Sequence, residues 1–209
     1  MQRYIVSQFD SNTFQVIDQN KQREICVCAN FDARQDGKAR AEQIASLLNQ
    51  HGKNEDAIDL SLLRTAIALA ASARKHGNHP FGALLADENG NILLEAENTV
   101  NTEHDASGHA ETNLVRLASK QFPVEMMAKS TLYTSTEPCP MCAGAIFWSG
   151  IGRVVYALSE DGLYALTGDS PESLKLPCRE VFACGGRPVE VLGPLLEEEA
   201  AKVHAGFWD

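Results

Sequence analysis

The chain has 209 residues, of which 44% are hydrophobic and 22% charged, and its formal net charge is −10. This length suits one ordinary domain, or one domain with a small appendage. No apolar run reaches the roughly 20 residues of a membrane span, and the start lacks the apolar core of a secretory signal, so a cytoplasmic protein is expected. The acidic balance disfavours a nucleic-acid partner, because such surfaces carry a basic excess.

Residues 1–55 are predicted to form a small β-β-β-α appendage. Short apolar runs bounded by turn residues predict three strands, over 4–6, 14–17 and 25–28. Apolar residues at helical spacing predict a helix over 39–48. We expect His51-Gly52-Lys53-Asn54 to end that helix and to act as a linker. The unit contains few apolar residues, so it is expected to depend on the rest of the protein for stability.

Residues 56–209 are predicted to form the larger domain. Its expected elements are a helix over 59–76, strands over 81–86 and 92–96, a helix over 108–118, a strand over 131–135, a helix from 140, strands over 153–157 and 189–192, and a helix over 197–207. Asn89-Gly90 is typical of a hairpin turn, and Pro140 suits a first helical position. This order predicts an α/β fold with a mixed sheet covered on both faces. Residues 158–179 are expected to form a loop or lid.

Two short segments carry residues typical of metal chemistry. They are His109-Ala110-Glu111 and Pro138-Cys139-Pro140-Met141-Cys142. Each alone is weak, because a Cys-x-x-Cys pair also occurs in redox dithiols and structural zinc sites. Together, at the starts of two predicted helices with a strand between them, they match the known H-x-E and P-C-x-x-C signature of zinc deaminases.

Side-chain chemistry supports a catalytic zinc ion at these residues. Cys139 and Cys142 lie three residues apart at a helix start, so both sulfurs can face one point, and a helix N-terminus stabilises the metal-binding thiolate form. His109 adds a ring nitrogen. Three protein ligands leave the fourth tetrahedral position for water, as in catalytic sites. Zinc lowers the pKa of such a water from about 15.7 towards 7.

Glu111 is the predicted general acid and base. It follows His109 by two residues, which rotates it well round a helix axis and makes it a poor fourth ligand. It can instead take a proton from the water, deliver it to a ring nitrogen and help the amino group leave as ammonia.

A structural zinc site is the alternative interpretation, with Cys178 or Cys184 as a fourth ligand. That reading leaves Glu111 and the proline before Cys139 unexplained. We expect Cys26 and Cys28 to be buried on a strand, and Cys178 and Cys184 to be ordinary thiols. His79 and His104 are further candidates for the lining of a pocket.

Residues from about 56 to 209 resemble the cytidine-deaminase superfamily, in the branch of guanine deaminase, fungal-type cytosine deaminase and the tRNA adenosine deaminases. The residues that carry the resemblance are His79 to Ala83, Glu97-Asn98, His109 to Glu111 and Thr136 to Ile146. The resemblance implies a three-layer α/β/α sandwich around a mixed five-stranded sheet. It also implies one catalytic Zn²⁺ per chain and a homodimer.

The resemblance further implies a substrate site. Asn98 matches an asparagine that binds the base, the backbone N–H of Ala110 would contact the ring's carbonyl side, and Phe81 matches a pocket aromatic. Trp148 belongs to an aromatic-Trp pair seen in guanine deaminases. Phe207 and Trp208 resemble C-terminal aromatics that close over a small flat ring, where they would exclude water.

The expected activity is hydrolytic release of ammonia from a free nucleobase, with guanine as first choice and cytosine second. Guanine deaminases use a second carboxylate after the fourth strand, where this chain has Glu160, Asp161 and Asp169 without a clean match, and Tyr164 stands where an acidic residue is expected. A tRNA adenosine deaminase is one alternative, although the sequence from Leu195 is acidic and would repel a phosphate backbone. A non-catalytic, zinc-stabilised binding module is another.

Overall fold

A computed structural model describes residues 4–10, 13–18, 23–29, 37–168 and 173–208. The chain divides into two compact units, Met1–Ile58 and Asp59–Asp209. Among the described residues, no helix combines the length and apolarity that crossing a bilayer requires.

The first unit contains an antiparallel sheet of three strands in the order β1-β2-β3, namely β1 (Tyr4–Asp10), β2 (Thr13–Asp18) and β3 (Arg23–Ala29). These strands cover the three predicted runs. Val16 packs with Ala41 and Ala45 of the following helix to form a small buried core. Cys26 and Cys28 lie on β3, but their side chains fall outside the described part of the structure.

The helix α1 (Gly37–Lys75) runs through the segment where a linker was predicted. That prediction is wrong, and the reason is energetic. A single glycine such as Gly52 costs a helix only about 1 kcal/mol relative to alanine, and no proline is present to force a break. The helix ends where expected, at Lys75, just before Gly77 adopts a positive φ of 86°.

The second unit is built on a five-stranded mixed sheet in the order β5-β4-β6-β7-β8. Its strands are β4 (Gly82–Ala86), β5 (Ile92–Glu97), β6 (Thr131–Thr136), β7 (Arg153–Leu158) and β8 (Glu190–Leu192). β4 pairs antiparallel with β5 and β6, whereas β6, β7 and β8 are parallel. The predicted mixed five-stranded sheet is confirmed.

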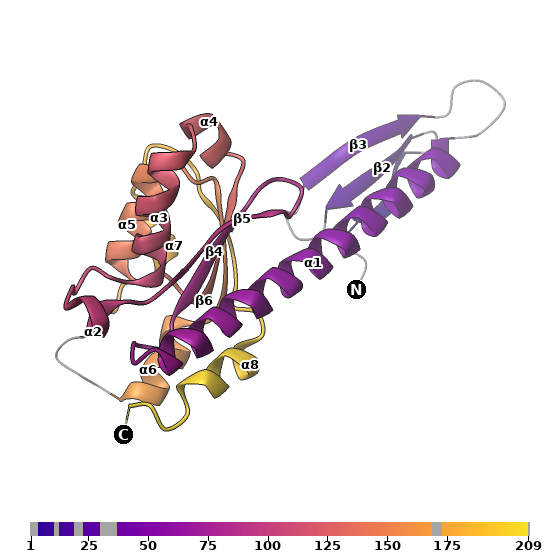
Figure 1. The fold of residues 1–209 in the computed structure, drawn as a ribbon. Helices are drawn as coiled ribbons and strands as arrows, with labels where there is room; N and C mark the ends of the chain where they lie inside the picture. The colour runs from indigo at the N-terminus through magenta and orange to yellow at the C-terminus, as the bar shows by residue number, and fades with distance from the viewer. Residues whose placement is uncertain (1–3, 11–12, 19–22, 30–36, 169–172, 209) are drawn as a thin grey trace. The chain divides into compact units, whose positions relative to one another are not determined.

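Helices cover both faces of this sheet, which confirms the predicted three-layer sandwich (Figure 1). On one face lie α3 (Ala110–Gln121), α5 (Pro140–Ser149) and α7 (Cys178–Ala183), and on the other lie the last turns of α1 and α8 (Glu197–Ala201). Successive strand residues enter opposite cores, because side chains alternate along a strand. Leu85 packs under α3 and α5, for example, and Leu84 packs under α1.

Five short elements were not predicted as such. They are α2 (Val100–Glu103), α4 (Val124–Met127), α6 (Glu160–Thr167), α7 and the 3₁₀ turn η2 (Lys202–His204). The expectation of a loop or lid over 158–179 is corrected by α6, whose N-cap Ser159 accepts a hydrogen bond from the backbone N–H of Gly162. The predicted C-terminal helix over 197–207 is shorter, since α8 ends at Ala201 and is followed by the 3₁₀ turn.

Candidate active site

The predicted metal ligands come from two helix starts beside the C-terminal end of β6. His109 is the N-cap residue of α3, and Cys139 is the N-cap residue of α5, with Pro140 in the first turn. Gly108 fixes the approach to His109, because its carbonyl accepts from the Thr99 N–H at 2.8 Å and a Cβ here would lie 2.8 Å from Thr99 Oγ1. Only glycine fits this crossing without a shift.

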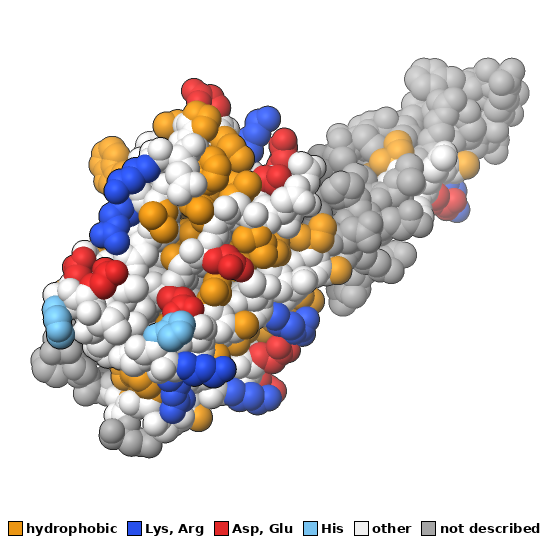
Figure 2. Space-filling model, in the orientation of Figure 1, with side chains coloured by type: hydrophobic (Ala, Val, Ile, Leu, Met, Phe, Trp, Pro, Cys, Tyr) orange, Lys and Arg blue, Asp and Glu red, His pale blue; other side chains and the backbone are white. Residues whose placement is uncertain are grey.

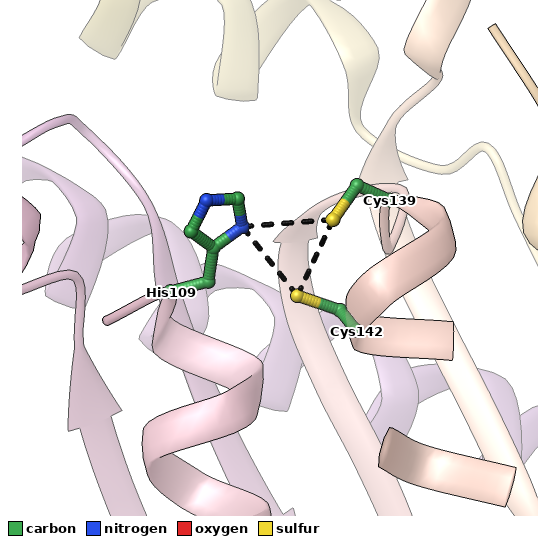
Figure 3. A group of neighbouring side chains, drawn as sticks. All are labelled: His109, Cys139 and Cys142. Atoms are coloured by element: carbon green, nitrogen blue, oxygen red, sulfur yellow. Dashed lines mark hydrogen bonds between the residues drawn. The ribbon is translucent and has the colours of Figure 1, made fainter. Parts of the chain in front are cut away.

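The three ligand side chains point at one another, as Figure 3 shows. His109 Nδ1 lies 3.6 Å from Cys139 Sγ and 3.5 Å from Cys142 Sγ, and the two sulfurs are 3.6 Å apart. A tetrahedral zinc ion, with bonds of about 2.3 Å to sulfur and about 2.0 Å to nitrogen, places its ligand atoms about 3.5–3.8 Å apart. The donor set and its spacing therefore fit zinc.

No fourth protein ligand joins this group among the described residues, since the cluster of ligand atoms within 4.8 Å comprises His109, Cys139 and Cys142 alone. Cys178, the first residue of α7, is buried in the core and Cys184 is exposed, and neither belongs to the ligand group, so neither completes a structural zinc site. This arrangement has the composition of an open, catalytic site.

The electrostatic environment favours a thiolate at Cys139. The neighbouring Cys142 thiol lowers the pKa of Cys139 to about 4, and the His109 ring acts in the same direction. Contact with Cys139 and burial together raise the pKa of Cys142. Both sulfurs also lie in the first turn of α5, where the partial positive charge of the helix N-terminus supports negative ligands.

Glu111 lies beside the ligand group and is almost fully buried, with 5% of its surface exposed. Its Oε1 accepts a hydrogen bond of 2.8 Å from Thr134 Oγ1 on β6, and its Oε2 lies 3.5 Å from Cys142 Sγ. Burial, with the nearby charge of Cys139 as a second cause, raises the pKa of Glu111. A carboxyl group with a raised pKa and one oxygen facing the ligand group is suited to moving protons.

A cavity of about 350 Å³ opens onto the ligand group. Its lining combines apolar walls with a few polar groups: Phe81, Ala106, His109, Glu111, Thr136, Glu137, Cys139, Pro140, Met141, Glu160, Leu163, Tyr164 and Leu174. Such a volume and mixture are typical of small-molecule sites. Phe81, His109, Glu111 and Cys139 were predicted and Glu137 lies in a motif that carries the resemblance, whereas Leu163 and Leu174 carry no local sequence signal.

Glu160 and Tyr164 form a polar pair on one wall of the cavity. The Tyr164 hydroxyl donates to Glu160 Oε1 at 3.0 Å, and burial is the main cause that raises the pKa of Glu160. The segment that bears them is anchored by Glu137, whose two carboxylate oxygens accept from the backbone N–H groups of Glu160 and Cys178. Of the acidic candidates after β7, Glu160 therefore lines the cavity, Asp161 is exposed and Asp169 lies outside the described residues.

Asn98 and Ala110 are both fully buried. Asn98 Oδ1 accepts from the backbone N–H of Val100, but its Nδ2 has no partner among the described residues. An unpaired buried amide donor is costly, so it marks a place where a ligand acceptor would be stabilising. Neither residue is among those that line the cavity surface.

The predicted C-terminal aromatics reach the edge of the site. Phe207, Trp208, His79, Phe81 and His204 form one group of rings, here called the aromatic cluster. Trp208 lies 6.2 Å from Phe81 and 5.5 Å from His79 between ring centroids, and it stacks on His204 at 6.0 Å. Of the five rings, Phe81 lines the cavity itself.

Trp148 and His104 are two further predicted residues that are absent from the cavity lining. Trp148 lies near the end of α5 with 86% of its surface exposed, and its ring contacts Phe147. His104, a candidate for the pocket lining, is exposed in the loop after α2. Trp148 therefore does not line this cavity, although the resemblance to guanine deaminases predicted a substrate-binding role for it.

Comparisons with known proteins agree with the geometry. Residues 56–158 match the family described as the cytidine and deoxycytidylate deaminase zinc-binding region. A probable cytosine deaminase of Schizosaccharomyces pombe is 46% identical over 153 residues, covering 72% of this chain and 93% of that protein. The chain belongs to this deaminase family. It is accordingly a zinc-binding deaminase, a hydrolase that acts on C–N bonds, with His109, Cys139 and Cys142 as its metal site.

Other members of the family are similar over much of the chain. A tRNA-specific adenosine deaminase of Bacillus subtilis is 34% identical over 147 residues, covering 70% of this chain and 86% of that protein. The solved structure of a guanine deaminase from Nitrosomonas europaea shares the fold, with a TM-score of 0.58 at 24% identity, covering 68% of this chain and 80% of that one.

Proposed function

We propose that this deaminase releases ammonia from a free nucleobase, with cytosine as the first candidate and guanine as the second. The observation that carries the proposal is the small cavity that joins the metal site to Glu111 and to the aromatic wall at Phe81. The order of candidates departs from the sequence-based expectation. It rests on the 46% identity to the probable cytosine deaminase, which extends over nearly that whole protein.

The proton chemistry falls to Glu111. Zinc held by His109, Cys139 and Cys142 would supply the Lewis acidity that makes water nucleophilic near neutral pH. Glu111 Oε1 is held by Thr134, while Oε2 faces the ligand group at 3.5 Å from Cys142 Sγ, so the carboxyl group presents its second oxygen to the reacting region. Its raised pKa suits a group that first accepts a proton from water and then donates it to the ring and the leaving amine.

Polar groups around the cavity would orient the base. The unpartnered Nδ2 of Asn98 is a donor for a ring carbonyl, and the backbone N–H of Ala110 is proposed to act on the same side. The Phe81 ring offers a flat apolar wall for stacking. Phe207 and Trp208 extend that wall through their ring contacts with His79 and Phe81.

Guanine stays a candidate because the structure supplies a second carboxyl group. Glu160 lines the cavity with Oε1 held by Tyr164, so Oε2 can accept from a ring N–H. Tyr164 stands where an acidic residue was expected. Its hydroxyl holds the carboxyl group of Glu160, one helical turn earlier. Guanine offers one more ring N–H than cytosine for such a carboxylate to bind.

A tRNA substrate is not favoured, although a tRNA-specific relative exists. A strand of nucleic acid requires a basic path along its phosphates. On the face drawn in Figure 2, Lys and Arg side chains are interspersed with Asp and Glu and form no continuous basic surface. The first turn of α8 is acidic, with Glu197, Glu198 and Glu199 in succession.

We also propose that the chain forms a homodimer through the exposed apolar side chains near the end of α5. Trp148 is 86% exposed and Val124, which lies against Gly150 after the same helix, is 64% exposed. Large apolar side chains gathered on a surface typically mark a protein interface. Figure 2 shows a group of hydrophobic side chains around α4, the helix that begins at Val124. Sedimentation of Trp148→Glu tests this, and an unchanged oligomeric state would contradict it.

Ammonia release from a panel of cytosine, guanine, adenine, their nucleosides and unmodified tRNA tests the proposed activity. We expect turnover of a free base, and its loss in Glu111→Ala with the zinc content retained. Glu42→Ala, which removes an exposed carboxyl group from the first unit, is the matched control. Turnover confined to tRNA would replace the proposal by the adenosine deaminase alternative. Zinc binding without any turnover would support a non-catalytic binding module.

A further inference from the structure

The last residues of the described chain, 203–208 (the C-terminal segment), have little regular structure to hold them in place. After the 3₁₀ turn ends at His204, two backbone hydrogen bonds remain among the described residues of the segment, from the N–H of Ala205 to the carbonyl of Lys202 at 3.4 Å and from the N–H of Phe207 to the carbonyl of His204 at 3.1 Å. Carbonyl groups at the end of a helical turn lack internal donors and need partners from elsewhere. The segment nevertheless carries Phe207 and Trp208 of the aromatic cluster.

One side chain supplies these missing donors. Arg74, in the last turn of α1, donates from Nη1 to the carbonyls of Val203 and Ala205, both at 2.8 Å, and from Nη2 to the carbonyl of Gly206 at 3.2 Å. The same guanidinium lies over the Phe207 ring at 5.5 Å from its centroid. A planar guanidinium can reach three carbonyls and a ring face at once, which a lysine ammonium cannot do with the same geometry.

The position of Arg74 along the chain ties the two halves of the aromatic cluster together. The helix that bears Arg74 ends one residue later, and the turn that follows carries His79 and Phe81. The C-terminal segment carries His204, Phe207 and Trp208. His204 is 2% exposed, its Nδ1 accepts from Trp208 Nε1 at 3.3 Å, and its ring lies 5.3 Å from that of Phe81.

We infer that Arg74 is a positioning residue, which holds the C-terminal segment so that Phe207 and Trp208 back the Phe81 wall of the substrate cavity. The inference rests on the proposed function for the role of that wall, but not for the contact itself. Arg74 touches neither the metal ligands nor Glu111 in the described structure, so its loss should alter base binding and leave the proton chemistry intact. Contacts of this kind act equally on bound substrate and on transition state, which predicts a change in KM with little change in kcat.

The experiment compares Arg74→Met, which keeps the apolar stem and removes every donor, with Arg74→Lys and with a matched control. Arg64→Met is that control, because Arg64 lies on the same helix and pairs with the side chain of Glu199 rather than with the C-terminal segment. Hydrogen exchange of the peptide spanning 203–208, followed by mass spectrometry, reports on the segment without any substrate. Zinc content and steady-state kinetics on the base identified by the panel complete the set.

We expect Arg74→Met to speed exchange in the C-terminal peptide on the order of tenfold, as the loss of charge-assisted hydrogen bonds implies, while peptides of α5 are unchanged. KM should rise on the order of tenfold with kcat within about threefold of the parent enzyme. Arg74→Lys should fall between the two, and Arg64→Met should match the parent in both measurements.

Unchanged exchange in Arg74→Met would overturn the inference, and so would faster exchange with an unchanged KM, since Arg74 would then be structural only. If no base on the panel is turned over by the parent protein, the proposed function fails by that result alone. The exchange measurement would still decide whether Arg74 holds the segment. Should Arg74→Met not fold, Arg74→Lys against Arg64→Met provides the same comparison.

Discussion

Two polar clusters lie near opposite ends of the central parallel strands β6 and β7, and they differ in how their hydrogen-bonding capacity is used. One is the ligand group of His109, Cys139 and Cys142, just beyond the C-terminal end of β6. The other joins Asp59 of α1 to Arg153, the first residue of the parallel strand β7, and to Tyr133. The sheet thus separates a reactive cluster from a structural one.

The structural cluster is saturated by internal partners. Asp59 is buried and accepts from the Tyr133 hydroxyl at 2.6 Å and from both terminal nitrogens of Arg153 at 2.9 and 2.7 Å. In the ligand group, by contrast, two sulfurs and a ring nitrogen converge on one point. Their separations match the spacing of ligand atoms around a zinc ion. Buried polar groups that satisfy each other stabilise a fold, whereas groups that converge on a common point indicate a ligand.

The largest effect predicted by this comparison follows the loss of one metal ligand. Cys142→Ala leaves two protein ligands, so we expect the zinc content to fall well below one per chain and the activity to drop by at least about a thousandfold. Metal analysis by atomic absorption and the ammonia assay measure the two quantities. Cys184→Ala, which removes an exposed thiol outside the group, should keep both. Full zinc content in Cys142→Ala would show that the metal lies elsewhere.

The next largest effect belongs to the structural cluster. Asp59→Ala leaves Arg153, whose side chain is 26% exposed and also lies near Glu190, without its main partner. The expected loss of unfolding free energy is therefore below the about 3–5 kcal/mol that breaking a fully buried ion pair costs. Denaturant titration measures this loss. We expect the zinc content of the folded variant to stay at one per chain, because this cluster lies at the opposite end of β6 and β7 from the ligand group. A variant that lost zinc while keeping its stability would reverse the assignment of the two clusters.

A third effect depends on pH and concerns His204, which belongs to neither cluster. Burial lowers the pKa of His204 to about 4 from an ordinary value of 6.5, and the charge of Arg74 acts in the same direction. Between about pH 6.5 and pH 4, His204 is therefore protonated in the unfolded chain but not in the folded chain. Stability is complete above pH 6.5 and declines as the pH falls towards 4, by on the order of 3 kcal/mol.

Unfolding curves of the parent protein and of His204→Phe, recorded between pH 7 and pH 4.5, test this expectation. The parent should lose more stability than the variant over that window, because the phenylalanine ring takes up no proton. Parallel losses in the two proteins would show that His204 is protonated in the folded state and that other groups govern the acid response.

The two clusters also differ in how far the sequence predicts them. His109, Glu111, Cys139 and Cys142 form local patterns at helix starts, and the sequence alone indicates their role. Asp59 and Arg153 are 94 positions apart, and the sequence around either residue does not predict that it pairs with the other. Long-range pairing of this kind depends on the register of strands and helices, which a single sequence does not encode locally.

Errors in the predicted elements have a similar physical origin. The strands predicted over 131–135 and 153–157 coincide with β6 and β7 to within one residue, and Gly77 was recognised as a helix end. Gly52 was given the same meaning, but glycine terminates a helix only where the following chain supports a left-handed cap. The start of α6 did carry a usable signal, since Ser159 followed by Glu160 and Asp161 is a favourable N-cap with an acidic first turn.

The smallest predicted effect tests how finely the reactive cluster is tuned. Thr134 Oγ1 donates to Glu111 Oε1 at 2.8 Å inside the core, and this hydrogen bond lowers the pKa of Glu111 against the stronger effect of burial. Thr134→Val keeps the side-chain shape and removes the donor, so the pKa of Glu111 should rise further and the carboxyl group should lose its fixed orientation. We expect kcat to fall on the order of tenfold, with the zinc content unchanged. The acidic limb of the pH–rate profile should move to higher pH, because a base with a higher pKa is protonated earlier as the pH falls. A profile identical to that of the parent would mean that Glu111 is held by its other neighbours and that Thr134 is only a packing residue.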